Sequence, residues 1–180
     1  MPEWMTIPDL PDDQQERRMH IERYEYAASV LKGKRVLDCA CGMGYGTDIM
    51  RCAGVLVSGI DKDKEAITLA RKRYPDCVYT TADVDAISFK GLDALVAFEF
   101  LEHLDRPELI IDRCGRACVS EIIASVPIRP TVHVNHWHRT DFTPDSFRKL
   151  IESRYRIVHE QEQIWSDGEP MYLMLHGQKL

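Results

Sequence analysis

The 180-residue chain is predicted to adopt an α/β fold: a doubly wound, seven-stranded mixed sheet with an antiparallel last strand pair. Apolar strand-like runs alternate with helical patterns through short connections, which is typical of a parallel sheet covered on both faces. A glycine-rich stretch follows the first strand-like run directly. The last two runs are joined across residues 166–168 without a helix, so we expect a hairpin at the edge of the sheet.

The elements are expected in the following order. Residues 1–13 form an irregular arm rich in proline, and Asp12 or Asp13 caps a helix over 14–32 that Gly33 ends. Pro107 and Pro144 suit the first turns of two later helices. The other helical patterns lie at 46–53, 63–73, 107–118 and 143–153. The strand-like runs lie at 35–39, 55–60, 77–80, 93–98, 121–126, 155–160 and 171–176. Because no linker or repeat interrupts the pattern, we expect a single domain over residues 14–180.

Composition limits the classes of protein that this chain can represent. A net charge of −6 argues against nonspecific coating of nucleic acid. The first twenty residues lack the pattern of a secretory signal, and no apolar run approaches ~18 residues, so we expect a cytoplasmic protein without a membrane span. The six cysteines show no CxxC spacing, which favours reduced thiols.

The stretch VLDCACGMGYGT, residues 36–47, points to a ligand past the carboxyl end of the first strand. Gly42, Gly44 and Gly46 allow a ligand to approach the backbone closely. A dinucleotide fits poorly, because the third glycine comes one residue early and Thr47 takes its place. Asp38 would also oppose a pyrophosphate, whereas it suits a cationic guest. S-adenosylmethionine carries an ammonium and a sulfonium, so it is the predicted cofactor.

Acids after the next two strands extend the predicted site. Asp61 lies nineteen residues after Gly42 and ends the second strand, where it can accept hydrogen bonds from ribose hydroxyls. This feature is shared by NAD and S-adenosylmethionine and does not separate them. Asp83 and Val84 follow the third strand and are expected to bind the adenine amino group and contact its ring, although Asp83 could equally cap a loop.

Four segments in order resemble the motifs of the class I S-adenosylmethionine-dependent methyltransferases. They are VLDCACGMGYG, GID, ADV and ALVAFEFLEHL, and the resemblance covers roughly residues 20–177. Ala40 stands where the family commonly has glycine, and we expect little effect. The resemblance implies a Rossmann-like methyltransferase domain, a helix at 14–32 over the cofactor and an acceptor lid at 128–142. It implies a cofactor site made of Arg23, Tyr24, Asp38, Ala40, Gly42, Gly44, Asp61, Lys62, Asp83, Val84 and Glu99.

Histidines are the candidate catalytic residues, because an oxygen or nitrogen acceptor can require a base with a pKa near neutrality. His103 lies in the segment after the fourth strand, and His136 and His138 lie in the expected lid. His103 can instead serve only to shape its loop. A small-molecule hydroxyl or amine is the favoured acceptor, and nucleic acid is not favoured as a partner. The oligomeric state stays open.

A second interpretation involves a divalent metal, which is possible but not favoured. Glu99, Glu102, His103 and His138 fall at places similar to the metal ligands of Hen1-type RNA 2′-O-methyltransferases. Two carboxylates and two imidazoles are a sound ligand set for a divalent ion. The acidic net charge and the absence of that family's full motif around 135–142 oppose an RNA acceptor. A protein that binds S-adenosylmethionine without turnover is the non-enzyme alternative.

Overall fold

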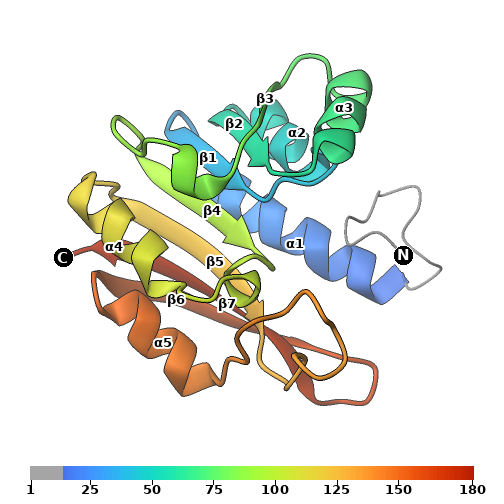
Figure 1. Cartoon of the computed structure of the whole chain (residues 1–180), viewed down its shortest axis with the longest axis vertical. Coiled ribbons are helices and arrows are strands. Elements are labelled where there is room, and N and C mark those ends of the chain that lie inside the picture. The colour runs from blue at the N-terminus through green and yellow to red at the C-terminus, as the bar shows by residue number, and fades with distance from the viewer. Residues whose placement is uncertain (1–13) are drawn as a thin grey trace. The chain divides into compact units, whose positions relative to one another are not determined.

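The computed structural model describes residues 14–180 (Figure 1). The predicted arm at 1–13, and with it the predicted cap at Asp12 or Asp13, lies outside the described residues. The chain divides into two compact units, the first ending at Ser88 and the second running from Phe89 to Leu180. The expectation of a single domain over 14–180 stays a prediction. We describe each unit by itself.

The first unit alternates helices with parallel strands. Its strand order is β3-β2-β1, and both neighbouring pairs are parallel. The elements are α1 (Gln14–Val30), β1 (Arg35–Cys39), α2 (Tyr45–Cys52), β2 (Leu56–Asp61), α3 (Lys64–Arg73), β3 (Val78–Thr81) and a short 3₁₀ turn at Val84–Ala86.

Local chemistry explains where these elements begin and end. Helix α1 ends at Val30, two residues before the predicted end at residue 32, and Gly33 lies in the turn that follows, with a φ of +76° that glycine adopts without steric cost. The side chain of Asp63 caps α3 by accepting hydrogen bonds from the amides of Glu65 and Ala66. Four of the five residues of β1 are buried, so this strand belongs to the core of its unit.

The second unit contains a four-stranded sheet with the order β4-β5-β7-β6. Strands β4 and β5 are parallel, whereas β5 with β7 and β6 with β7 are antiparallel. Helices α4 and α5 are neighbours (Figure 1). The elements are β4 (Ala94–Phe98), a 3₁₀ turn at Leu101–His103, α4 (Glu108–Arg116), β5 (Glu121–Pro127), α5 (Pro144–Glu152), β6 (Tyr155–Ile164) and β7 (Pro170–Lys179).

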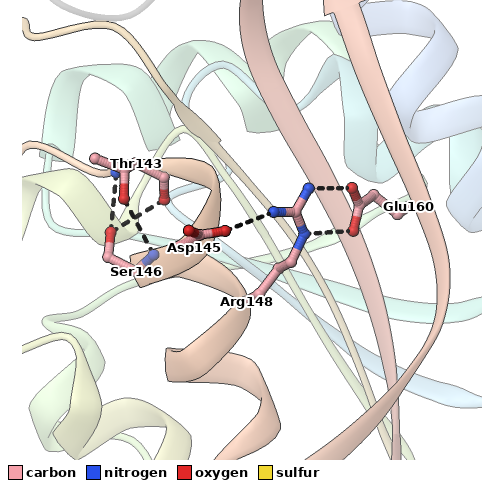
Figure 2. Close-up of polar contacts among 5 residues, drawn as sticks. All are labelled: Thr143, Asp145, Ser146, Arg148 and Glu160. Atoms are coloured by element: carbon pink, nitrogen blue, oxygen red, sulfur yellow. Dashed lines mark hydrogen bonds and ion pairs between the residues drawn. The ribbon is translucent and has the colours of Figure 1, made fainter.

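The start of α5 is fixed by side chains that the sequence makes recognisable (Figure 2). Thr143 and Ser146 form a capping box, in which each side chain accepts a hydrogen bond from the other residue's amide. Arg148 forms a two-pronged ion pair with Glu160 on β6, with N···O distances of 2.9 and 2.6 Å, and also contacts Asp145. The capped first turn of α5 is therefore followed by a side chain that ties the helix to β6.

The fold predicted from the sequence is confirmed. All seven strands are present, and the hairpin across residues 166–168 is antiparallel. Strands β6 and β7 are longer than expected, because β6 continues toward the turn as far as Ile164, whereas β7 continues mainly away from the turn as far as Lys179. No helix in residues 14–180 combines the length and apolar character needed to cross a bilayer.

No disulfide joins any of the six cysteines, all of which lie within the described residues. Cys39 and Cys41 in the first unit and Cys114 in the second are buried, whereas Cys52 and Cys118 are exposed. Burial is the main reason why the pKa of Cys41 is raised well above its ordinary value and that of Cys114 to about 12. The buried thiols therefore behave as small apolar side chains.

Candidate functional site

Strand β1 delivers Asp38 to a fully buried position at the glycine-rich loop. Its Oδ2 accepts a 2.6 Å hydrogen bond from the Thr47 hydroxyl, and its Oδ1 accepts a 3.2 Å hydrogen bond from the Tyr24 hydroxyl. The carboxylate is thus held by one residue from α2 and one from α1. The hydroxyl of Tyr24, one of the predicted cofactor residues, contacts an acid of the protein, and the role of Tyr24 toward the cofactor stays a prediction.

Burial sets the electrostatics of Asp38. Loss of hydration raises the pKa of this carboxyl to about 7, and the hydrogen bonds from Thr47 and Tyr24 only partly oppose that effect. The carboxyl of Asp61 makes a smaller contribution to the same rise in pKa. The protonation of Asp38 therefore changes near neutral pH, where a nearby cation would favour its ionised form.

The loop after β1 needs left-handed backbone at three positions. Ala40, Gly42 and Gly44 have φ values of +56°, +52° and +84°. A side chain at Gly44 would collide with the ring of Tyr79, whose hydroxyl donates a 2.9 Å hydrogen bond to the Gly44 carbonyl. The close approach of Tyr79 therefore requires glycine at position 44, in addition to its backbone conformation.

Asp61 joins the end of β2 to this loop. The amide of Gly42 donates a hydrogen bond of 3.0 Å to Asp61 Oδ2, and the amide of Asp63 donates one of 2.8 Å to Oδ1. Partial burial raises the pKa of Asp61, and the two amide bonds oppose that rise. Because each carboxylate oxygen has two lone pairs, both oxygens keep capacity to accept a hydrogen bond from a ligand hydroxyl.

The remaining predicted cofactor residues of the first unit differ in exposure. Asp83 is exposed and caps the turn after β3 by accepting a 2.9 Å hydrogen bond from the amide of Asp85, while Val84 is buried. Lys62 is exposed, whereas Arg23 is only 1% exposed. Asp83 thus has the loop-capping role that the sequence left open, and its role toward adenine stays a prediction.

In the second unit, Glu99 follows β4 with a φ of +49°, a rare conformation for a side-chain-bearing residue. Its carboxylate accepts a 2.7 Å hydrogen bond from the Ser125 hydroxyl, and its amide donates to the Ser125 carbonyl at 3.0 Å. The strained backbone therefore directs Glu99 toward β5. Its predicted contact with a cofactor stays a prediction.

The structure brings together three of the four predicted metal ligands. One possible ligand atom from each of Glu102, His103 and His138 lies within 4.8 Å of the others, and Glu99 is not part of this group. Glu102 is 1% exposed, and the His103 and His138 rings meet edge to face with centroids 4.7 Å apart. Burial, with a smaller contribution from His103, lowers the pKa of His138 to about 4. His138 is therefore neutral at physiological pH.

The segment 128–142 separates the three histidines that it contains. His138 is partly buried beside His103, whereas His133 and His136 are exposed. The His136 ring lies against the Trp137 indole, with centroids 4.5 Å apart. The predicted catalytic histidines thus divide into a pair in contact, His103 and His138, and a surface residue, His136.

Sequence reasoning did not find three side chains that organise these sites. Thr47 holds Asp38, Tyr79 holds the Gly44 carbonyl, and Thr131 lies 2.6 Å from His138 Nδ1. The sequence offered a signal only for Thr47, which stands where a dinucleotide fingerprint has glycine. Tyr79 and Thr131 come from separate segments, and no local pattern marks them.

Residues 37–121 match the model of a family described as a methyltransferase domain. A probable S-adenosylmethionine-dependent methyltransferase of Mycobacterium tuberculosis is 28% identical over 156 residues, which cover 81% of this chain and 57% of that protein. A ubiquinone biosynthesis O-methyltransferase of Paracidovorax citrulli is 32% identical over 94 residues, or 48% of this chain and 40% of that one. The matches thus extend over less than two thirds of these relatives' length.

Solved structures share the fold at low sequence identity. The magnesium protoporphyrin IX methyltransferase of Synechocystis, solved with bound S-adenosylmethionine, has a TM-score of 0.77 and 16% identity, covering 95% of this chain and 86% of that one. The N-methyltransferase NodS of Bradyrhizobium japonicum, solved with S-adenosyl-L-homocysteine, has a TM-score of 0.78 and 16% identity, with coverages of 94% and 90%.

Proposed function

The chain belongs to the class I S-adenosylmethionine-dependent methyltransferases, and we propose that it transfers the methyl group of this cofactor to an oxygen or nitrogen of a small molecule. Methyl transfer is an in-line displacement, and the cofactor supplies the activated electrophile. The protein's contribution is to bind both reactants in line and to exclude water, which can be worth about 7–11 kcal/mol.

The observation that carries the cofactor assignment is the hydrogen bond between Gly42 and Asp61. It fixes the carboxylate at the end of β2 against the backbone of the glycine loop. A ribose placed there would donate its hydroxyls to Asp61, while the nearby Asp38 would favour the cationic end of the cofactor. An acid in each of these positions supports S-adenosylmethionine over a dinucleotide, whose pyrophosphate Asp38 would repel.

On the acceptor side, the second unit offers His103 and His138. Both rings are partly buried and in contact, whereas His136 is on the surface. A pKa of about 4 makes His138 a weak base at neutral pH. His138 is therefore the better candidate for a neutral ligand or hydrogen-bond acceptor, which leaves His103 as the candidate for accepting a proton from a hydroxyl or amine.

A small-molecule acceptor is supported by charge and by the relatives. The chain carries a net charge of −6, which disfavours a nucleic-acid acceptor. The matched proteins that are named for ubiquinone biosynthesis and for magnesium protoporphyrin IX act on small molecules. An RNA 2′-hydroxyl acceptor remains the second candidate, because three of its predicted metal ligands lie together.

The donor set of Glu102, His103 and His138 fits a divalent ion. Two imidazoles and one carboxylate are a recurring ligand set for transition metals. These three side chains would hold the ion, and a bound ion would supply a Lewis acid that lowers the pKa of an acceptor hydroxyl. Glu102 is buried and the two rings already meet, so the protein would need little rearrangement to bring the ligands together.

Titration calorimetry and product analysis test the proposed function. S-adenosylmethionine should bind to the wild-type chain, and Asp61→Ala should weaken that binding. Mass spectrometry should then detect a methylated product from a panel of phenols, carboxylates, amines and short RNAs. Cofactor binding without any product across the panel would favour the non-catalytic alternative, and absence of binding would reject the proposal.

Metal use is tested on the same protein. After chelator treatment, the chain should take up one equivalent of Mn²⁺ or Zn²⁺, and His138→Ala should lower that affinity. His136→Ala is the matched control, because His136 comes from the same segment and lies outside the ligand cluster. Full methyl transfer in the presence of chelator would show that the reaction does not need a metal. A methylated RNA product that is lost with chelator and restored by metal would favour the RNA 2′-hydroxyl acceptor.

A further inference from the structure

Two further residues, Thr131 and Asp141, lie on the Nδ1 side of the His138 ring. The Thr131 hydroxyl oxygen lies 2.6 Å from His138 Nδ1 and 3.5 Å from Asp141 Oδ1. The same Asp141 oxygen accepts hydrogen bonds from the amides of Thr131 and Val132, at 2.6 and 3.0 Å. Thr131 is 9% exposed although the adjoining residues of its segment lie on the surface. The Asp141 carboxylate, the Thr131 hydroxyl and the His138 imidazole thus form a row of side chains, each in contact with the next.

The positions of the protons in this row of side chains can be worked out by elimination. The amide bonds from Thr131 and Val132 lower the pKa of Asp141, so this carboxylate is ionised at neutral pH and only accepts hydrogen bonds. The Thr131 hydroxyl has a single proton. If that proton pointed to His138, the lone pairs of Thr131 and Asp141 would face each other. Both contacts are hydrogen bonds only when Thr131 donates to Asp141 and His138 Nδ1 donates to Thr131.

His103 has the same proton arrangement for a simpler reason. Its Nδ1 lies 3.2 Å from the carbonyl oxygen of Trp137. A carbonyl cannot donate, so Nδ1 must carry the proton in this contact. In a neutral ring the Nε2 atom is then the unprotonated nitrogen. The two neighbouring imidazoles would therefore carry their protons on the same nitrogen, Nδ1.

We propose that Thr131, whose hydroxyl donates to Asp141, is a positioning residue that keeps the proton of His138 on Nδ1 and leaves Nε2 as an acceptor. This inference rests on the proposed role of His138 in the acceptor-side cluster, because an unprotonated Nε2 is what either a metal ion or a substrate proton requires. It assigns a function to two residues that contact neither reactant. Partners of this kind behind an imidazole ligand typically change its affinity or activity by about 10–100-fold.

Nitrogen NMR of the cofactor-free protein tests this proposal directly. Long-range ¹H–¹⁵N spectra of histidine-labelled protein distinguish a protonated ring nitrogen from an unprotonated one, and the His138 signals are those lost in His138→Gln. We expect protonated Nδ1 and unprotonated Nε2 in the wild type. A histidine ring in water prefers the opposite tautomer, so loss of the hydrogen bond in Thr131→Val should shift the tautomer ratio toward Nε2–H by about tenfold.

Two controls separate positioning from a structural effect. Thr131→Ser restores the hydroxyl and should restore the wild-type tautomer, while the exposed His133 in the same segment should show unchanged signals in every variant. A wild-type His138 protonated on Nε2, or an unchanged tautomer in Thr131→Val, would overturn the proposal. Because the spectra require neither cofactor nor acceptor, a lack of methyl transfer would reject the proposed function and leave this inference standing.

Discussion

The main-chain amide of Gly42 and the side chain of Asp61 are joined by a 3.0 Å hydrogen bond. The glycine-rich loop and the end of β2, nineteen residues apart in the chain, are thus joined, and the Asp61 carboxylate holds the loop in place. The same carboxylate is the proposed partner of the ribose. Substitutions at Asp61 consequently affect the shape of the loop as well as the ligand contact.

We expect Asp61→Ala to weaken S-adenosylmethionine binding by roughly 1–3 kcal/mol, because a hydroxyl loses a charged partner and the Gly42 amide loses its acceptor. Calorimetric titration measures the loss. Asp61→Asn keeps an acceptor oxygen for Gly42 and should lie between the wild type and the alanine variant. Equal affinity of Asp61→Ala and wild type would remove Asp61 from the site.

Asp38 should make the stability of the cofactor-free protein depend on pH. Its pKa is raised from 3.8 to about 7 by burial, so the folded state binds a proton more tightly than the unfolded state. The corresponding stabilisation is complete below about pH 4 and is lost as pH rises through 7.

Asp38→Asn should remove this dependence. Relative to the wild type, the variant should gain stability between pH 5 and pH 8 by on the order of a few kcal/mol, since a tenfold change in a dissociation constant corresponds to about 1.4 kcal/mol. Urea unfolding at a series of pH values gives both curves. Parallel curves for the two proteins would show that Asp38 does not titrate in this range.

Tyr79→Phe should loosen the glycine loop. Removing the hydroxyl eliminates the hydrogen bond to the Gly44 carbonyl, which we expect to lower the free energy of unfolding by about 0.5–1.5 kcal/mol and to weaken cofactor binding. Tyr155→Phe is the matched control, because Tyr155 is also buried and donates to a carbonyl, that of Val119. Both variants should lose similar stability, and an equal loss of cofactor affinity in both would contradict a specific role for Tyr79.

Thr143→Ala should destabilise α5 without changing cofactor binding. The lost cap leaves the amide of Ser146 without its side-chain acceptor, which typically costs about 1 kcal/mol. Chemical unfolding of the purified variant measures the effect. Thr143→Ser keeps a hydroxyl at the same place and should recover most of the stability, so a serine variant as unstable as alanine would argue against the cap.

Much of the fold was predictable because it depends on local patterns. Pro107 and Pro144 mark the starts of α4 and α5, as predicted, and apolar runs mark the strands. The ends of β6 and β7 were underestimated, since strand pairing across the hairpin extends them over polar residues such as Glu162.

The candidate site was predictable only where one motif contains the whole interaction. Asp38 and Asp61 are recognisable from spacing, but the choice of Thr47 and Tyr24 as partners of Asp38 depends on tertiary packing. Glu99 lies three residues before Glu102, but its backbone is left-handed and its carboxylate contacts Ser125 outside the cluster. No periodicity predicts such a conformation for a residue other than glycine.

The distribution of thiols gives this chain a built-in reporter of unfolding. A soluble alkylating reagent should modify the exposed Cys52 and Cys118 at once, whereas the buried Cys39, Cys41 and Cys114 should react only when their surroundings open. Two of these protected thiols belong to the first unit and one to the second. Peptide-resolved alkylation rates in mild denaturant would therefore reveal whether the two units open in a single cooperative event or one before the other.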